Sequence, residues 1–230
     1  MRRLIAILSA GTSAVVLVAQ SPLDRLVGAF PADQVIELQL PPTSFWFDHS
    51  LNRIASSAQV LMGIESVGDS QKQPDPSDPL LALTGMSFRD AVDLLVNARP
   101  GYSWRADGDI VHVLLAGREG RALALPIDHF AVEKATLSEV IHPLCETFQP
   151  STSQRGYAGS GPPPSPLGQR RFTVSTMRGS LMQVLDAIAE AHGALIWHVN
   201  YPGPMLPNFP VSIGFVTFDG WGIRIDGCVP

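Results

Sequence analysis

The sequence has few of the residues on which several classes of protein depend. Its 230 residues include two cysteines, Cys145 and Cys228, and two lysines, Lys72 and Lys134. Charged residues make up 16% of the chain, against about a quarter in ordinary globular proteins. The net charge is −5, which disfavours nucleic-acid binding because that depends on contacts to phosphates. Covalent chemistry based on lysine has few candidates.

Motifs for catalysis and metal binding are also missing. No two of the six histidines have the i, i+4 spacing of a helical metal site, and the two cysteines lie far apart in the sequence. The chain has no phosphate-binding glycine loop with lysine. Ala158–Gly161 departs from the nucleophile elbow of serine hydrolases because alanine stands at the first glycine position. We therefore expect no catalytic residue, no metal and no cofactor.

The N-terminus has the pattern of an export signal. Arg2 and Arg3 precede an uncharged, largely apolar stretch from Leu4 to Ala19, and small residues follow. This order is typical of a secretory signal peptide, here over residues 1–20. The stretch is shorter than the ~20 residues that span a bilayer comfortably. We expect a periplasmic or secreted protein with no membrane span after cleavage; the alternative is an uncleaved N-terminal anchor.

Export also affects the two cysteines. An oxidising compartment permits a disulfide between Cys145 and Cys228. The alternative is a buried free thiol at Cys145, which lies on the apolar face of an expected helix. Sequence separation does not decide between the two, because a disulfide depends on the distance between Cα atoms.

Apolar periodicity in the first half predicts alternating strands and helices. Ser87 and Asp90 fit a capping box, and Asp107-Gly108 fits the turn of a hairpin. The expected elements are, in chain order, a strand at 35–40, a helix at 49–59, a strand at 60–67, a loop at 68–79, a strand at 80–84, a helix after Ser87, and strands at 102–105 and 109–115.

The second half repeats this plan. The expected elements are a helix after Thr136 and Glu139 that Pro143 kinks or shortens, a mobile loop at 149–169, a strand at 171–175, a helix from the capping box Ser180/Gln183 to the C-cap Gly193, and strands at 194–201, 211–218 and 221–225. The segment 85–95 matches 178–188 in pattern, and Asp93 falls on Asp186. Trp104 falls near Trp197 in the same alignment.

These patterns predict an α+β fold of two small tandem units, at 35–118 and 122–230. Each unit is of βαβ type, with helices packed on a small mixed sheet, and loops rich in proline and glycine join the elements. A duplicated domain would explain the two units, and chance similarity between amphipathic helices is the alternative.

The first unit resembles a known family. The carrying segments are Leu83–Phe88, Ala91–Leu95, Gly101–Trp104 and Asp107–Val111. They are similar to the short domain at the N-terminus of secretins and TonB-dependent receptors, over about residues 35–115. The loop at 68–79 is long for that family. The resemblance implies an exported, non-catalytic module that contacts proteins of the cell envelope.

Two tryptophans are candidates for contact with a partner. Trp46 lies in an aromatic triplet, Phe45–Phe47, and Trp221 follows the turn at Asp219-Gly220. Large aromatic side chains often anchor interfaces. The alternative for the triplet is packing in the core at the start of a helix.

We expect an interaction module of the bacterial cell envelope that acts by protein–protein contact, in association with a secretion or transport machine. Self-association through open sheet edges is a further expectation. The alternatives are a periplasmic module that binds peptide or glycan, and a periplasmic hydrolase.

Overall fold

The computed structural model describes seven parts of the chain, residues 21–28, 45–67, 83, 85–116, 122–148, 164–203 and 211–229, with the backbone alone for 45, 46 and 227–229. The expected signal peptide at 1–20, strand at 35–40 and loop at 68–79 lie outside the described residues. So do most of the expected strand at 80–84 and residues 149–163 of the expected mobile loop.

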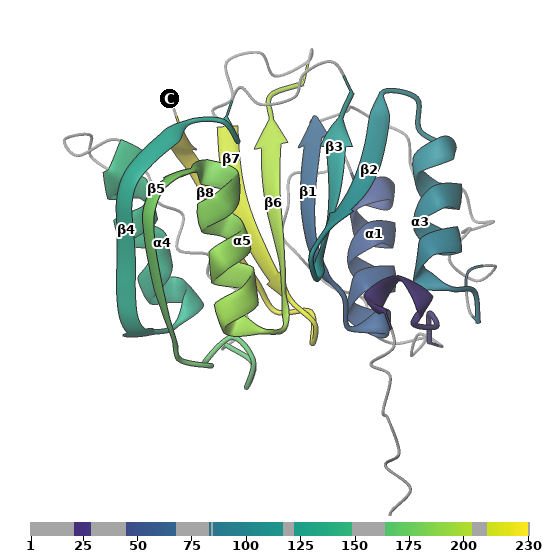
Figure 1. The fold of residues 1–230 in the computed structure, drawn as a ribbon, viewed down its shortest axis with the longest axis horizontal. Coiled ribbons are helices and arrows are strands. Elements are labelled where there is room, and N and C mark those ends of the chain that lie inside the picture. The colour runs from purple at the N-terminus through teal and green to yellow at the C-terminus, as the bar shows by residue number, and fades with distance from the viewer. Residues whose placement is uncertain are drawn as a thin grey trace, which may run out of the picture.

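The elements are labelled as in Figure 1. In chain order they are η1 (Pro22–Asp24), α1 (Phe45–Ala58), β1 (Leu61–Val67), α3 (Phe88–Asn97), β2 (Tyr102–Asp107), β3 (Ile110–Leu115), β4 (Pro126–Ala135), α4 (Leu137–Phe148), β5 (Phe172–Ser180), α5 (Leu181–His192), β6 (Leu195–Tyr201), β7 (Val211–Thr217) and β8 (Gly222–Val229).

A mixed six-stranded sheet lies at the centre of an α+β fold, the class that the sequence predicts. Its strand order is β2-β3-β1-β6-β7-β8. β1 is parallel to β3 and to β6, and the other neighbours are antiparallel. The two halves of the chain therefore contribute to one sheet, because Met62–Val67 of the first half pairs with Ile196–Tyr201 of the second.

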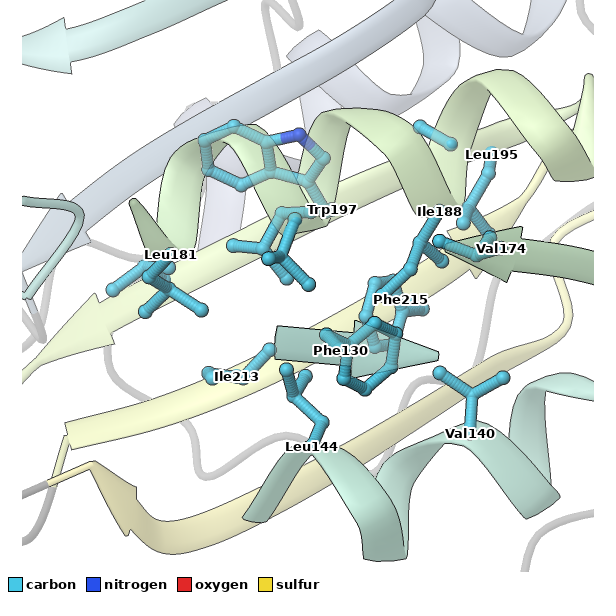
Figure 2. Packing of buried hydrophobic residues seen from close by; sticks show 14 of the residues in the cluster. Phe130, Val140, Leu144, Val174, Leu181, Ile188, Leu195, Trp197, Ile213 and Phe215 are labelled. Atoms are coloured by element: carbon cyan, nitrogen blue, oxygen red, sulfur yellow. The ribbon is translucent and has the colours of Figure 1, made fainter. Parts of the chain in front are cut away.

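Helices cover both faces of this sheet. α1 and α3 pack on one face in an apolar cluster that includes Met62, Ile64 and Ile196. α4 and α5 pack on the other face, against Leu195, Trp197 and other residues of β6 to β8. Figure 2 shows side chains from α4, α5, β6 and β7 meeting in this second core. The antiparallel pair β4–β5 contacts the same two helices and completes the layers at one end of the molecule (Figure 1).

Local sequence signals explain how the helices begin and end. The Ser180 hydroxyl accepts from the Gln183 amide, and the Gln183 side chain accepts in return from the Ser180 amide, which completes a capping box. Gly193 ends α5 in the left-handed conformation, with φ 75°. α1 begins at Phe45, earlier than expected, and α4 continues past Pro143 to Phe148.

β4 is the element for which the sequence gives no signal. Strand prediction depends on strict alternation of apolar and polar residues. In β4 only Ile127, Phe130 and Ala135 are buried. The register shifts between Val132 and Ala135, and Lys134 has φ 48°. This bulge changes which side chains face the core, so the sequence lacks the alternation that would predict a strand.

One arrangement of side chains occurs in both halves. The indole nitrogen of Trp104 on β2 donates to Asp93 on α3 at 2.7 Å. The indole nitrogen of Trp197 on β6 donates to Asp186 on α5 at 2.9 Å. In both cases 11 residues separate aspartate from tryptophan. α3 and α5 also begin at equivalent serine caps, Ser87 and Ser180.

Backbone hydrogen bonds around these helices are equivalent too. The amides of Phe88 and Leu181, the first helical residues, donate to the carbonyls of Arg25 and Leu125. The carbonyls of Gly101 and Ala194 accept from the first residue after β3 and after β7, respectively. The unit α3–β2–β3 therefore has the same local arrangement as the unit α5–β6–β7.

Candidate functional site

Of the two candidate tryptophans, only Trp221 has a described side chain. Trp46 lies in the first turn of α1, and its side chain is outside the described residues. Trp221 follows the β7–β8 turn and is half-buried, packed against the core of the second half. Gly168 lies against its ring, since a Cβ there would be 2.5 Å from Trp221 Cε3. The 165–168 segment thus covers part of this indole.

Asp219 holds that segment in place. Its carboxylate accepts from the Ser165 hydroxyl at 2.9 Å and from the Leu167 amide at 3.4 Å. Burial acts to raise the pKa of Asp219, but hydrogen bonds from Thr217 and Ser165 outweigh it and hold the pKa below its usual value. Trp221 therefore belongs to an ordered turn and is partly covered by it.

Cys145 is buried on α4 and is disulfide-bonded. α4 packs against β8, the strand that contains Cys228. The side chain of Cys228 lies outside the described residues, so its pairing with Cys145 stays a prediction.

The histidines are dispersed over the fold. Within the described ranges, no three His, Cys, Asp or Glu side chains come together to hold a metal ion. His198 Nε2 is 2.8 Å from the Asn52 side-chain oxygen, and His112 Nε2 is 2.9 Å from Asp186. Both of these histidines are buried.

Polar side chains join the two halves where β1 meets β6. On the α1 side, the Ser66 hydroxyl donates to Asn200, and His198 lies against Asn52 of α1. Asp48 is 8% exposed in the same region. Burial raises the pKa of Asp48 to about 7, although a hydrogen bond with Ser66 and the charge of Arg99 offset part of this effect.

The opposite face of this junction has its own polar contacts. Glu65 is fully buried and accepts from the Tyr201 hydroxyl at 2.7 Å and from the Leu115 amide at 3.2 Å. Asp186 of α5 contacts both His112 and the indole of Trp197. Buried polar groups of this kind require their partners, so these bonds fix how the halves join.

These buried groups have the chemistry of acids and bases but little access to solvent. The side chain of His112 is 0% exposed and that of Asp186 is 19% exposed. A general base must reach a proton on a bound substrate. The contacts of Glu65, Asp186, His112 and His198 join β1, β3, β6 and the helices, and this makes them structural ties.

β2 exposes most of its side chains. It lies at one end of the strand order, and Ser103, Arg105, Ala106 and Asp107 are exposed. Trp104 is half-buried beneath α3, with the Arg89 guanidinium carbon 5.8 Å from its ring centroid. An exposed strand edge presents unpaired amides and carbonyls to other chains.

The sequence shows the same Asp–Trp spacing in both units. It does not show that β6 lies in the middle of the sheet and β2 at the end of the described strand order. A pattern of 11 residues predicts that a helix and the following strand contact each other. Whether that strand lies at the edge or in the middle of a sheet depends on a distant segment, β1, which pairs with β6 and not with β2.

No helix in the described ranges is long and apolar enough to cross a membrane. Comparisons of the chain with protein-family profiles, with curated proteins and with solved structures find no match.

Proposed function

We propose that the chain is an exported, non-catalytic interaction module of the bacterial cell envelope that acts by protein–protein contact, in association with a secretion or transport machine. The open edge at β2 carries the proposal. Its exposed residues include both charges and a small apolar side chain, Arg105, Asp107 and Ala106. Sheet edges of this kind bind extended segments through their backbone groups.

The charged N-terminus supports the cellular part of the proposal. Arg2 and Arg3 followed by an uncharged stretch favour export, and the disulfide of Cys145 fits an oxidising compartment. Fractionation of cells that produce the full chain tests this part. We expect a periplasmic or secreted product that has lost its first 20 or so residues, and a cytoplasmic product of full mass would overturn it.

Photo-crosslinking in cells tests the contact. A photoreactive residue at Ser103 or Arg105 on β2 is compared with one at Glu190, which is exposed on α5. We expect a discrete adduct with an envelope protein from the β2 positions and none from the control. The absence of adducts from every exposed strand, with a strictly monomeric chain in sedimentation, would contradict the proposal.

A further inference from the structure

We infer that the open edge of β2 is a slot for one parallel strand, supplied by an extended segment of an envelope partner with a glycine opposite Trp104. This inference rests on the proposed function and makes its interface specific. It follows from comparing β2 with β6, the equivalent strand of the second unit.

The β6 edge shows what fills such a slot. β1 pairs with β6 in parallel, with Gly63 beside Trp197 and Ser66 beside Asn200. The Trp197 ring lies over Gly63 so closely that a Cβ at that glycine would be 2.0 Å from Cζ2. Only glycine fits beneath the indole, and the indole is anchored by Asp186.

The β2 edge has the same tryptophan–aspartate contact, but no described strand lies beside it. Trp104 is anchored by Asp93 of α3 as Trp197 is by Asp186. No described strand pairs with the outer side of β2. Ile196 and Val199 of β6 are fully buried beside β1, whereas Ser103 and Ala106 at the equivalent positions of β2 are exposed.

The backbone of β2 is oriented to receive a strand. The Gly101 carbonyl accepts from the Ala116 amide at 2.8 Å, on the β3 side. In an antiparallel pair, alternate residues direct both of their backbone groups to the partner strand. The amides and carbonyls of Tyr102, Trp104 and Ala106 therefore point to the open edge.

The register of β1 on β6 specifies the chemistry of the partner. If the partner residue opposite Trp104 is glycine, the next residue lies beside Arg105 and the third after the glycine lies beside Asp107. Both β2 side chains are exposed, and Arg105 has Met182 Sδ at 4.0 Å. The slot therefore favours an acidic residue directly after the glycine and a basic residue two positions later.

The probe is a synthetic peptide with the sequence of residues 61–67 of this chain, carrying Ile64→Glu and Ser66→Lys. Hydrogen exchange of the labelled full chain, measured by NMR, reports on β2. At a peptide concentration ten times its Kd, we expect exchange at Tyr102, Trp104 and Ala106 to slow by about tenfold. The same peptide with Gly63→Val is the matched control, and it should protect none of them.

Variants of the chain and labels on the peptide test edge and direction. Ala106→Pro removes an edge amide and should abolish binding, while Ala106→Val keeps that amide and should bind as before. A nitroxide at the peptide N-terminus should broaden the Tyr102 amide, and one at its C-terminus should broaden the Gly108 amide. The reverse pattern would overturn parallel binding.

The other outcomes separate this inference from the proposed function. Protection at β8 or β5, together with crosslinks from those strands in cells, would overturn the β2 slot and leave the proposed function intact. Protection of β2 that grows with the concentration of the chain alone would assign the edge to a second copy and overturn the partner proposed here. No protection by the peptide at its solubility limit would also overturn the slot.

Discussion

The unit α3–β2–β3 and the unit α5–β6–β7 begin with the same local structure and end in different surroundings. Each has a serine-capped helix whose aspartate binds the indole of the following strand. In the second unit β1 lies beside β6, and Trp197 is fully buried. In the first unit β2 lies at the end of the sheet formed by the described strands, and Trp104 is half-buried. One local motif therefore produces a core in one place and a surface in the other.

The largest expected difference lies at the two tryptophans. Trp197→Ala should lower the free energy of unfolding by about 4 kcal/mol because it empties a fully buried site, whereas Trp104→Ala should cost about 1 kcal/mol. Urea denaturation of both variants measures this. Equal losses would contradict the contrast between core and edge, and Trp197→Phe serves where the alanine variant does not fold.

The second largest effect is expected at the glycine that lies beneath Trp197. Gly63→Ala places a Cβ 2.0 Å from Trp197 Cζ2, so the ring must move, and we expect a loss of about 3 kcal/mol in the free energy of unfolding. Gly214 on β7 is the matched control. The nearest atom to a Cβ there is 3.5 Å away, in ordinary contact, so Gly214→Ala should change stability by less than about 1 kcal/mol. A tolerated Gly63→Ala would contradict the close packing.

Two buried ionisable groups near the junction of β1 and β6, Asp48 and His198, predict an unusual pH dependence of the free energy of unfolding. The pKa of Asp48 is raised by burial from 3.8 to about 7, so its stabilisation is present below pH 3.8 and is lost as the pH rises towards 7. The pKa of His198 is lowered by burial from 6.5 to about 4, so its stabilisation is present above pH 6.5 and is lost as the pH falls towards 4. Between these limits the two contributions cancel.

Single substitutions expose each contribution. Relative to the unsubstituted chain, Asp48→Asn should lose about 2 kcal/mol of stability between pH 6.5 and pH 5, because His198 then acts alone. His198→Gln should change in the opposite direction over the same interval. Arg105→Gln, at the exposed equivalent of His198 in the first unit, should leave the profile unchanged. Denaturation at the two pH values decides, and parallel profiles for all three variants would contradict the cancellation.

The smallest expected effect is the loss of a helix cap, and it should be the same in both units. Ser87→Ala and Ser180→Ala each remove an oxygen that accepts from the third amide of a helix, and each should cost about 1 kcal/mol. Helix caps act locally, so the edge or central position of the following strand should not matter. Ser103→Ala, on the exposed face of β2, controls for loss of a hydroxyl. A much larger loss at Ser180 in thermal or urea unfolding would contradict this equality.

Much of the local structure was predictable because it depends on neighbours in sequence. The capping signals at Ser87 and Ser180, the C-cap at Gly193 and the hairpin turn at Gly108 all appear in the structure. Gly108 and Gly193 both have a positive φ, which glycine adopts readily. β4 was not predictable, because its bulge breaks the alternation of buried residues.

The polar contacts where β1 meets β6 could not be predicted from sequence patterns. Glu65 with Tyr201, and Asn52 with His198, lie more than a hundred residues apart along the chain. Each side chain is an ordinary strand or helix residue until a distant partner is placed beside it. Nothing in the spacing of residues specifies that partner, and this also holds for the edge that we propose as the interface.

Local sequence specifies the caps of α3 and α5, the turns, the α+β class and the repeated Asp–Trp spacing, because each depends on contacts within one helix, one turn or one helix–strand pair. The position of β1 against β6, with β2 at the end of the described sheet, depends instead on tertiary packing. The physical reason is that strand pairing uses backbone groups common to all residues, so the choice between the two edges depends on long-range packing, here Gly63 beneath Trp197 and the buried bonds on either side of it.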